Sequence, residues 1–391
     1  MLPAFTAIRT VVVREYAVSN GGPEDPVDDP MSLDRAGSGS CLSLRWGTAP
    51  PCPSLPPVRV VVTGGAGFIG SHLTDTLLAR GHEVVCVDDL SKGSLENIAH
   101  HSDNRWFRFA HMDIRNGSLL EEAGRGCAAV VHLAAAKIAR YDSAFHSLGI
   151  NLDGARAALE LARVNNAKFV LGSTSDVYGK NPSLPFGENS DLVIGPSTSR
   201  RWSYAVSKLC DEHLAFAYED EFGLPICILR FFGTYGARQY LDWWGGPQGV
   251  FLQAIAEGAP VEIHGDGKQS RCFIHVSDLV EGIARAIERD QTVGEIVNIG
   301  NDEEITIVEL ARLMHELSGT ASELQLEFIP YTTFTANYED VRRRVPDTTK
   351  MRALLELEPR VDLRRGISML WDWYRTRSAA ALGSAVSPNG V

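Results

Sequence analysis

Tyr204 and Lys208 are the first candidates for chemistry, because they stand four residues apart in a stretch with a helical pattern. At this spacing both side chains lie on one face of a helix. An ammonium group beside a phenol stabilises the phenolate, and such a tyrosine can accept a proton from a hydroxyl group near neutral pH. A tyrosine and a lysine at this spacing are more often a plain solvated surface, so the pair needs support from a second motif.

Three glycines supply the second motif. Gly64, Gly67 and Gly70 lie between an apolar run at residues 58–63 and a helical pattern that starts near Ile69. Glycine lets the backbone turn tightly and approach a pyrophosphate, whose charge is stabilised by free N–H groups and by the positive end of the helix dipole. A strand, a glycine loop and a helix in this order predict a dinucleotide-binding site.

Two aspartates indicate which dinucleotide is expected. Asp88 and Asp89 end the next apolar run, about twenty residues after the glycines, as the dinucleotide-binding fingerprint requires. A carboxylate at this place accepts hydrogen bonds from the ribose hydroxyls of NAD and repels the 2′-phosphate of NADP. The sequence therefore predicts NAD as the cofactor.

The sequence TGGAGFIG at residues 63–70, followed by DDLS from Asp88, resembles the start of extended short-chain dehydrogenases/reductases, in the branch of nucleotide-sugar epimerases and dehydratases. The resemblance covers residues 58–377 and includes the pair formed by Tyr204 and Lys208. It implies a nucleotide-diphosphate sugar as substrate and a homodimer formed through two helices of each subunit. It also implies the cofactor-binding residues, which are Gly64, Gly67, Phe68, Ile69, Gly70, Asp88, Asp113, Ile114, Ala134, Ala135, Lys137, Tyr204 and Lys208.

Thr174, Ser175 and Asp176 are further candidate catalytic residues, at the end of an apolar run where ligands of a parallel sheet bind. By the resemblance, Thr174 hydrogen-bonds the sugar oxygen that Tyr204 deprotonates. Simple 4-epimerases of the family carry small or neutral residues at the positions of Ser175 and Asp176. Dehydratases and decarboxylases carry an acid, commonly Glu, that serves the C5 proton or the C6 substituent. Asp176 is one methylene shorter, and a hydrogen bond within its own loop is the alternative role.

Arg271 and Arg344 are the candidate substrate-binding residues. The stretches 196–208 and 267–273 resemble bacterial UDP-glucuronate decarboxylases, in which the arginine matching Arg271 lies beside the sugar nucleotide. Arg344 begins the sequence RVPD, which resembles the family's Arg-x-Pro-Asp near the substrate diphosphate. A guanidinium group binds carboxylate or phosphate through two parallel hydrogen bonds, so both arginines suit an anionic substrate.

We expect an enzyme that oxidises the sugar at C4 with NAD and then eliminates water or carbon dioxide, as 4,6-dehydratases and UDP-glucuronate decarboxylases do. The alternative is an NDP-sugar 4-epimerase of the UDP-glucose or UDP-glucuronate type. It is favoured by Lys137, which resembles the epimerase loop, and by Gly233, which stands where many relatives have a substrate-binding Asn. A non-catalytic, NAD-sensing protein is the third hypothesis, and the presence of both Tyr204 and Lys208 argues against it.

Short β-branched runs alternate with amphipathic stretches from residue 58 onward, which is the pattern of parallel strands joined by helices. The sequence predicts an α/β fold with a Rossmann-type doubly wound parallel sheet at residues 58–235 and a smaller α/β substrate lobe at 236–377. Residues 1–57, rich in Gly, Pro and Ser, and residues 378–391 are expected to be flexible tails. The expected strands are 58–63, 83–88, 128–133, 168–173, 225–230, 261–264 and 296–299, and the expected helices are 69–80, 143–165 and 204–222.

Composition and charge exclude several classes of function. The chain has 391 residues and a net charge of −12, which argues against a nucleic-acid partner. No apolar run is long enough to cross a bilayer, so no membrane association is expected. The seven cysteines lack metal-ligand spacing, so no metal is expected, and their odd number fits a reducing cytoplasm.

Overall fold

The computed structural model describes residues 56–137, 144–333 and 340–385, without the side chains of residues 379–385. Residues 1–55 of the expected N-terminal tail, and residues 386–391 of the expected C-terminal tail, lie outside the described residues. None of the helices in the described ranges is long and apolar enough to cross a membrane.

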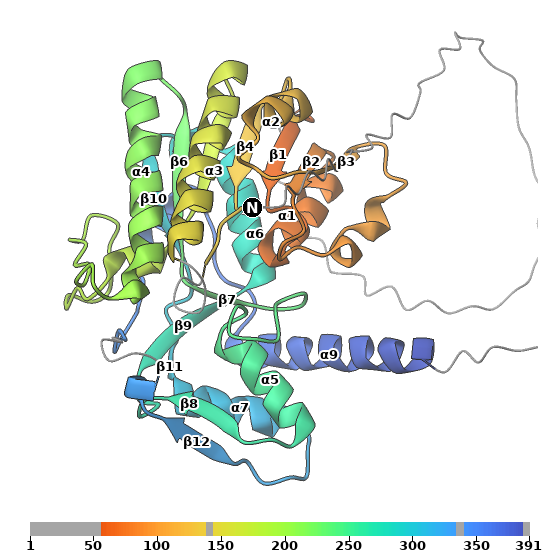
Figure 1. The fold of residues 1–391 in the computed structure, drawn as a ribbon, viewed down its shortest axis with the longest axis vertical. Coiled ribbons are helices and arrows are strands. Elements are labelled where there is room, and N and C mark those ends of the chain that lie inside the picture. Colours follow the sequence, from red (N-terminus) through yellow and green to blue (C-terminus); the bar gives the residue numbers. More distant parts are fainter. Residues whose placement is uncertain (1–55, 138–143, 334–339, 386–391) are drawn as a thin grey trace, which may run out of the picture. The chain divides into compact units, whose positions relative to one another are not determined.

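A seven-stranded sheet positions most of the predicted site residues, with the strand order β10-β6-β5-β4-β1-β2-β3 (Figure 1). All neighbouring strands in it are parallel. The chain order reverses between β1 and β4, which confirms the predicted doubly wound sheet and places a ligand crevice at the carboxyl ends of these strands. The strands are β1 (Arg59–Thr63), β2 (Glu83–Asp88), β3 (Phe107–His111), β4 (Ala129–His132), β5 (Lys168–Thr174), β6 (Ile226–Phe231) and β10 (Glu295–Ile299).

Helices cover both faces of this sheet, because its strands are apolar on both sides. In β1, Val60 and Val62 belong to one buried core and Val61 to the other, as the alternation of side chains in a strand requires. The first core includes α1 (Phe68–Ala79), α6 (Val276–Glu288) and α8 (Thr349–Leu355). The second includes α2 (Gly117–Gly124), α3 (Ala144–Asn165) and α4 (Ser203–Phe222).

The remaining elements form the smaller lobe predicted from the sequence (Figure 1). A three-stranded sheet contains β7 (Gly233–Tyr235), β9 (Ser270–His275) and β11 (Glu304–Thr306), and a two-stranded sheet contains β8 (Val261–His264) and β12 (Leu326–Ile329). Helices α5 (Pro247–Glu257), α7 (Ile307–Ser318) and α9 (Leu363–Ala385) complete it around a third core. Short 3-10 turns occur in both parts of the structure. They are η1 (Leu95–Asn97), η2 (Ala99–His101), η3 (Ser175–Tyr178), η4 (Arg200–Trp202), η5 (Asp290–Thr292) and η6 (Tyr331–Thr333).

Three features differ from the sequence expectations. Strand β3 and helix α2 were not expected, and β3 is the edge strand of the sheet, with mostly half-buried or exposed side chains. Strand β10 and helices α6 and α8 come from the segment expected to form the substrate lobe, yet they complete the first sheet and its cover. Helix α9 continues past Ser378 to Ala385, because the alanines there favour helix over a flexible tail.

Candidate active site

The loop between β1 and α1 takes its shape from glycine. Gly64 has a φ of +68°, in the left-handed region that favours glycine. A Cβ atom on Gly70 would lie 2.1 Å from the carbonyl oxygen of Gly64, so a larger residue would push helix α1 off the loop. No described side chain caps the start of α1 after Gly67. Free N–H groups at the positive end of this helix fit a dinucleotide pyrophosphate.

Asp88 braces this loop from the end of β2. Its carboxylate accepts hydrogen bonds from the backbone N–H groups of Ala66 and Leu90, at 3.0 and 2.8 Å. Burial raises the pKa of Asp88, and these two hydrogen bonds oppose the increase. The exposed Asp89 lies beside Asp88, and both line the cleft next to the glycine loop. Their positions fit the predicted ribose contact, with Asp88 holding the loop as well.

The side of the same cleft that residues 134–137 form is tied to neighbouring elements by short polar contacts. The side-chain oxygen of Asn151 accepts a hydrogen bond from the backbone N–H of Ala136 at 2.7 Å. Lys137 donates from Nζ to the carbonyl oxygen of Trp244 at 3.2 Å. The cleft brings together Gly64, Gly67, Phe68, Ile69, Gly70, Asp88, Asp113, Ile114, Ala134, Ala135, Lys137, Thr174, Ser175, Asp176 and Tyr204.

Lys208 is the predicted cofactor residue that does not line the cleft. Tyr204 and Lys208 lie on helix α4, and the Lys208 side chain is only 1% exposed. Its Nζ forms an ion pair with the carboxylate of Asp211 at 2.9 Å, and the Asp211 side chain has no exposed surface. Burial raises the pKa of Tyr204, and the carboxylates of Asp176 and Asp211 raise it further. The surroundings of Tyr204 therefore favour the protonated phenol.

His132, at the end of β4, contributes a neutral imidazole to the buried surroundings of Lys208. Burial lowers its pKa to about 3, and the charge of Lys208 lowers it in the same direction. The Thr63 hydroxyl oxygen accepts the backbone N–H groups of Leu133 and Ala134, at 3.1 and 3.2 Å, so its proton is left for Nδ1 of His132 at 2.9 Å. The imidazole proton is therefore assigned to Nε2, which has no hydrogen-bond partner among the described residues.

Asp176 is held between two arginines at the start of η3. Arg201 and Arg344 both reach its Oδ1, at 3.0 and 2.7 Å. Its backbone N–H donates to the Thr174 hydroxyl at 3.2 Å, which fixes the turn that also buries Ser175. Burial alone would raise the pKa of Asp176, but Arg344 and Arg201 outweigh burial and hold this pKa well below its usual range. Asp176 is thus a permanent carboxylate.

Arg271 and Arg344 line a second cleft, in the direction of the smaller lobe. Arg271 forms an ion pair with Asp340 at 3.0 Å and donates to the carbonyl oxygens of Ser270 and Val341, at 2.7 and 2.8 Å. Burial lowers the pKa of Arg344 to about 10, against the favourable effect of Asp176. The charged residues that line this cleft are Lys137, Arg201, Arg271 and Arg344, against Asp176 and Asp340. The excess of two positive charges suits an anionic ligand.

The two clefts meet at Tyr204. Both are lined by Lys137, Asp176, Tyr204, Gly233, Thr234, Gly245 and Arg344. A dinucleotide on the glycine loop and an anion beside the arginines would therefore each reach the Tyr204 side chain. A phenol between a redox cofactor and a substrate hydroxyl can transfer a proton while hydride moves to the cofactor.

Sequence reasoning missed several residues that shape this site. Asp211 is three residues after Lys208 and seven after Tyr204, so its helical spacing was a usable signal. Arg201 stood within a motif but received no role of its own. Asp340 carries no local pattern, because it becomes relevant only through its long-range ion pair with Arg271.

Comparisons with known proteins agree with this geometry. Residues 60–300 match the model of the NAD dependent epimerase/dehydratase family. UDP-N-acetyl-alpha-D-glucosaminuronate decarboxylase of Bacillus cytotoxicus is 34% identical over 320 residues, which cover 81% of this chain and 98% of that protein. UDP-glucuronic acid decarboxylase 4 of Arabidopsis thaliana is 37% identical over 322 residues, which cover 82% of this chain and 69% of that protein.

Solved structures with the same fold include enzymes named as 4-epimerases, in contrast to the two decarboxylases above. UDP-glucose 4-epimerase of Thermotoga maritima, solved with UDP-glucose, is 30% identical with a TM-score of 0.73, and the match covers 82% of this chain and 99% of that one. UDP-glucuronic acid 4-epimerase of Bacillus cereus, solved with UDP-glucuronic acid and NAD, is 29% identical with a TM-score of 0.72 and the same two coverages, 82% and 99%.

Proposed function

Because this chain belongs to the NAD-dependent epimerase/dehydratase family, we propose that it is a decarboxylase of a UDP-linked hexuronic acid. The decarboxylases of Bacillus cytotoxicus and Arabidopsis thaliana support this choice among the reactions of the family. Bound NAD would supply the acceptor, and later the donor, of the C4 hydride. The chain's own residues then have to bind the anion, remove the C4 hydroxyl proton and protect the intermediate.

The excess of positive charge beside Tyr204 is the observation that carries the proposal. A UDP-hexuronate has a diphosphate and a C6 carboxylate, so it carries one more negative charge than a UDP-hexose, whose sugar is neutral. Arg201, Arg271 and Arg344 can donate to these groups, and two of them already bind the carboxylate of Asp176, at 3.0 and 2.7 Å. Together they offset the repulsion expected from a protein with a net charge of −12.

Tyr204 and Thr174 carry the first step in this proposal. Thr174 holds the C4 hydroxyl oxygen, and Tyr204 accepts its proton as the C4 hydride leaves. The product is a 4-keto sugar whose C6 carboxylate is attached to the neighbouring C5 atom. Cleavage of the C5–C6 bond releases carbon dioxide and delivers the electron pair to the C4 carbonyl. A proton from solvent at C5, and return of the hydride to C4 together with the Tyr204 proton to the C4 oxygen, would complete the reaction.

The state of Asp176 favours decarboxylation over dehydration. Loss of water requires a proton donor for the leaving hydroxyl group, and Asp176 is held deprotonated by Arg201 and Arg344. Loss of carbon dioxide needs no such donor, because the electron pair of the breaking C5–C6 bond moves to the C4 ketone. We therefore assign Asp176 to electrostatic organisation of the arginines around the substrate, in place of the acid or base role expected from the sequence.

A UDP-glucuronate 4-epimerase is the second candidate, and the same contacts of Asp176 favour it. Epimerisation needs oxidation, rotation of the 4-keto sugar and reduction from the other face, and none of these steps requires an acid or base besides Tyr204. The UDP-glucuronic acid 4-epimerase of Bacillus cereus, which has the same fold, supports this alternative.

The test is incubation of the purified chain and NAD with UDP-glucuronate, UDP-N-acetylglucosaminuronate, UDP-glucose and dTDP-glucose. We expect release of carbon dioxide from a uronate substrate and no net formation of NADH. A product of unchanged mass would establish the 4-epimerase instead, and a loss of water would establish a dehydratase. Stoichiometric NADH would point to an ordinary dehydrogenase and contradict both candidates.

We also propose a homodimer formed through α3 and α4. These helices pack side by side and carry exposed apolar side chains: Phe145 is 90% exposed, Phe222 is 53% and Val206 is 38%. A second copy would cover them and form a paired four-helix surface. Light scattering should give twice the chain mass, and Phe145→Asp should give the single-chain mass. We further propose a cytoplasmic location, which cell fractionation would test.

A further inference from the structure

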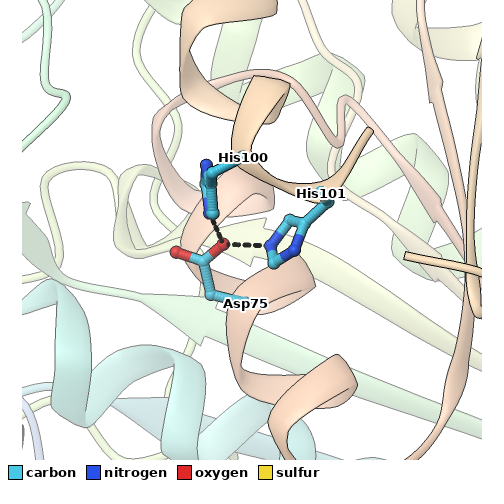
Figure 2. Close-up of side chains that lie close together, drawn as sticks. All are labelled: Asp75, His100 and His101. Carbon is cyan, nitrogen blue, oxygen red and sulfur yellow. Dashed lines mark hydrogen bonds and ion pairs between the residues drawn. The ribbon is translucent and has the colours of Figure 1, made fainter. Parts of the chain in front are cut away.

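Asp75, His100 and His101 form a compact cluster outside the two clefts (Figure 2). Asp75 lies on helix α1, and the two histidines end the η2 turn between β2 and β3. The Nε2 atoms of His100 and His101 lie 2.9 and 2.7 Å from Oδ1 of Asp75. The ring centroids of the histidines are 4.0 Å apart, so both imidazoles converge on one carboxylate oxygen.

This cluster offers two imidazole nitrogens and one carboxylate oxygen, which is a donor set that zinc takes in proteins. The three ligand atoms lie within 4.8 Å of one another. Zinc bonds of about 2.0–2.1 Å in a tetrahedron place ligand atoms about 3.3 Å apart, so the contacts of 2.7 and 2.9 Å would open by about 0.5 Å. Each neutral imidazole would move its proton to Nδ1, and a water molecule would complete the shell.

The groups around this cluster have opposite effects on the binding of a cation. Arg238 donates to Oδ2 of Asp75 at 2.8 Å, which leaves Oδ1 to the histidines and fixes the carboxylate plane, as second partners of metal ligands do. The guanidinium charge also weakens the attraction for a cation, so we expect weaker binding than at a four-ligand structural zinc site. The His100 side chain is 46% exposed, so an ion can enter without opening the fold.

We propose that Asp75, His100 and His101 bind a divalent transition-metal ion, with Zn²⁺ the best match. The ion would tie α1, which starts at the glycine loop, to the connection between β2 and β3. Through Arg238 it would also tie α1 to the segment that follows β7. That segment is already fixed to α1 by His72, whose Nε2 lies 2.9 Å from the carbonyl oxygen of Ala237. The role is structural and does not depend on the proposed reaction.

The test is calorimetric titration of the full metal-free chain with ZnCl₂ in a buffer that does not chelate zinc. We expect one saturable site per chain and a zinc-dependent rise in Tm. His100→Gln and His101→Gln should each weaken binding by about tenfold or more. His213→Gln, which removes an exposed imidazole from helix α4, is the matched control and should bind as the wild type does. Mg²⁺ should not compete, because it prefers oxygen ligands.

Two results would overturn the proposal. The first is the absence of saturable binding up to millimolar zinc. The second is unchanged affinity in both His100→Gln and His101→Gln, which would place any bound zinc elsewhere, for example at the exposed Cys210. Circular dichroism of the variants separates loss of a ligand from loss of the fold, and His100→Gln is the safer variant because its side chain is half-exposed.

Discussion

Asp211→Asn should shift the acid limb of the pH–rate profile to lower pH. The Asp211 carboxylate raises the pKa of Tyr204 and neutralises the ammonium charge of Lys208. The substitution keeps the shape of the side chain and one acceptor for Lys208 Nζ, now 2.9 Å from the carboxylate. It removes the negative charge beside Lys208. An uncompensated ammonium group and a lost carboxylate both favour the phenolate, so the pKa of Tyr204 must fall.

The magnitude follows from the helix geometry. Tyr204 and Asp211 are seven residues apart on α4, a rise of about 10 Å. Two unit charges at this distance interact by about 1.7 kcal/mol at an effective dielectric constant near 20, and by about 0.4 kcal/mol in water. These energies correspond to roughly 1.2 and 0.3 pKa units. We therefore expect the acid limb to move down by roughly 0.3 to 1.2 pH units.

The assay is kcat/KM against pH for carbon dioxide release, with wild type, Asp211→Asn and Asp220→Asn as a control. Asp220 is exposed on the same helix, so its substitution should leave the profile unchanged. Breaking a buried ion pair costs up to about 3–5 kcal/mol, so urea unfolding must confirm that the variant is folded under the assay conditions. An acid limb that stays in place or moves to higher pH, in a folded variant, would refute this account of Lys208 and Asp211.

Three further predictions concern the clefts. Gly70→Ala should abolish NAD binding measured by calorimetry, since its Cβ would lie 2.1 Å from the carbonyl oxygen of Gly64. Arg271→Met should raise KM for the sugar nucleotide by at least about tenfold through a lost charge-assisted hydrogen bond, with kcat less affected in steady-state assays. Asp176→Asn weakens the ion pairs that position Arg201 and Arg344, so it should retain oxidation at C4, seen as reduced bound NAD, while release of carbon dioxide falls by about tenfold; a wild-type rate of release would exclude Asp176 from the reaction.

Local patterns predicted the elements that line the proposed cofactor cleft. Strand β2 has the predicted bounds, and β1 and α4 begin within one residue of them, because strongly apolar runs and glycine turns are local signals. Strand β3 was not predicted, because most side chains of this edge strand are half-buried or exposed and give no apolar run in the sequence. The fold class was predictable because alternating strands and helices admit few arrangements.

Contacts between distant segments could not be predicted. Asp176 was expected to serve as an acid or base, and no sequence pattern indicated that Arg201 and Arg344, which approach from different parts of the chain, bind its carboxylate. A motif gives the identity of a side chain at each position, but not which charges surround it after folding. The same limit applies to Asp75, which is 25 residues before His100 and showed no metal-ligand spacing.

Strand β10 also determines how this protein can be divided. It pairs with β6 in parallel, and β6 is almost fully buried and strongly apolar. A fragment that ends near residue 235 would keep the glycine loop and Tyr204 but expose β6 as an unprotected sheet edge. Such an edge recruits strands from other molecules, so we expect this fragment to aggregate on expression. The dinucleotide-binding segment is therefore unsuited to transfer as an independent module, and any shortened version must retain residues through β10.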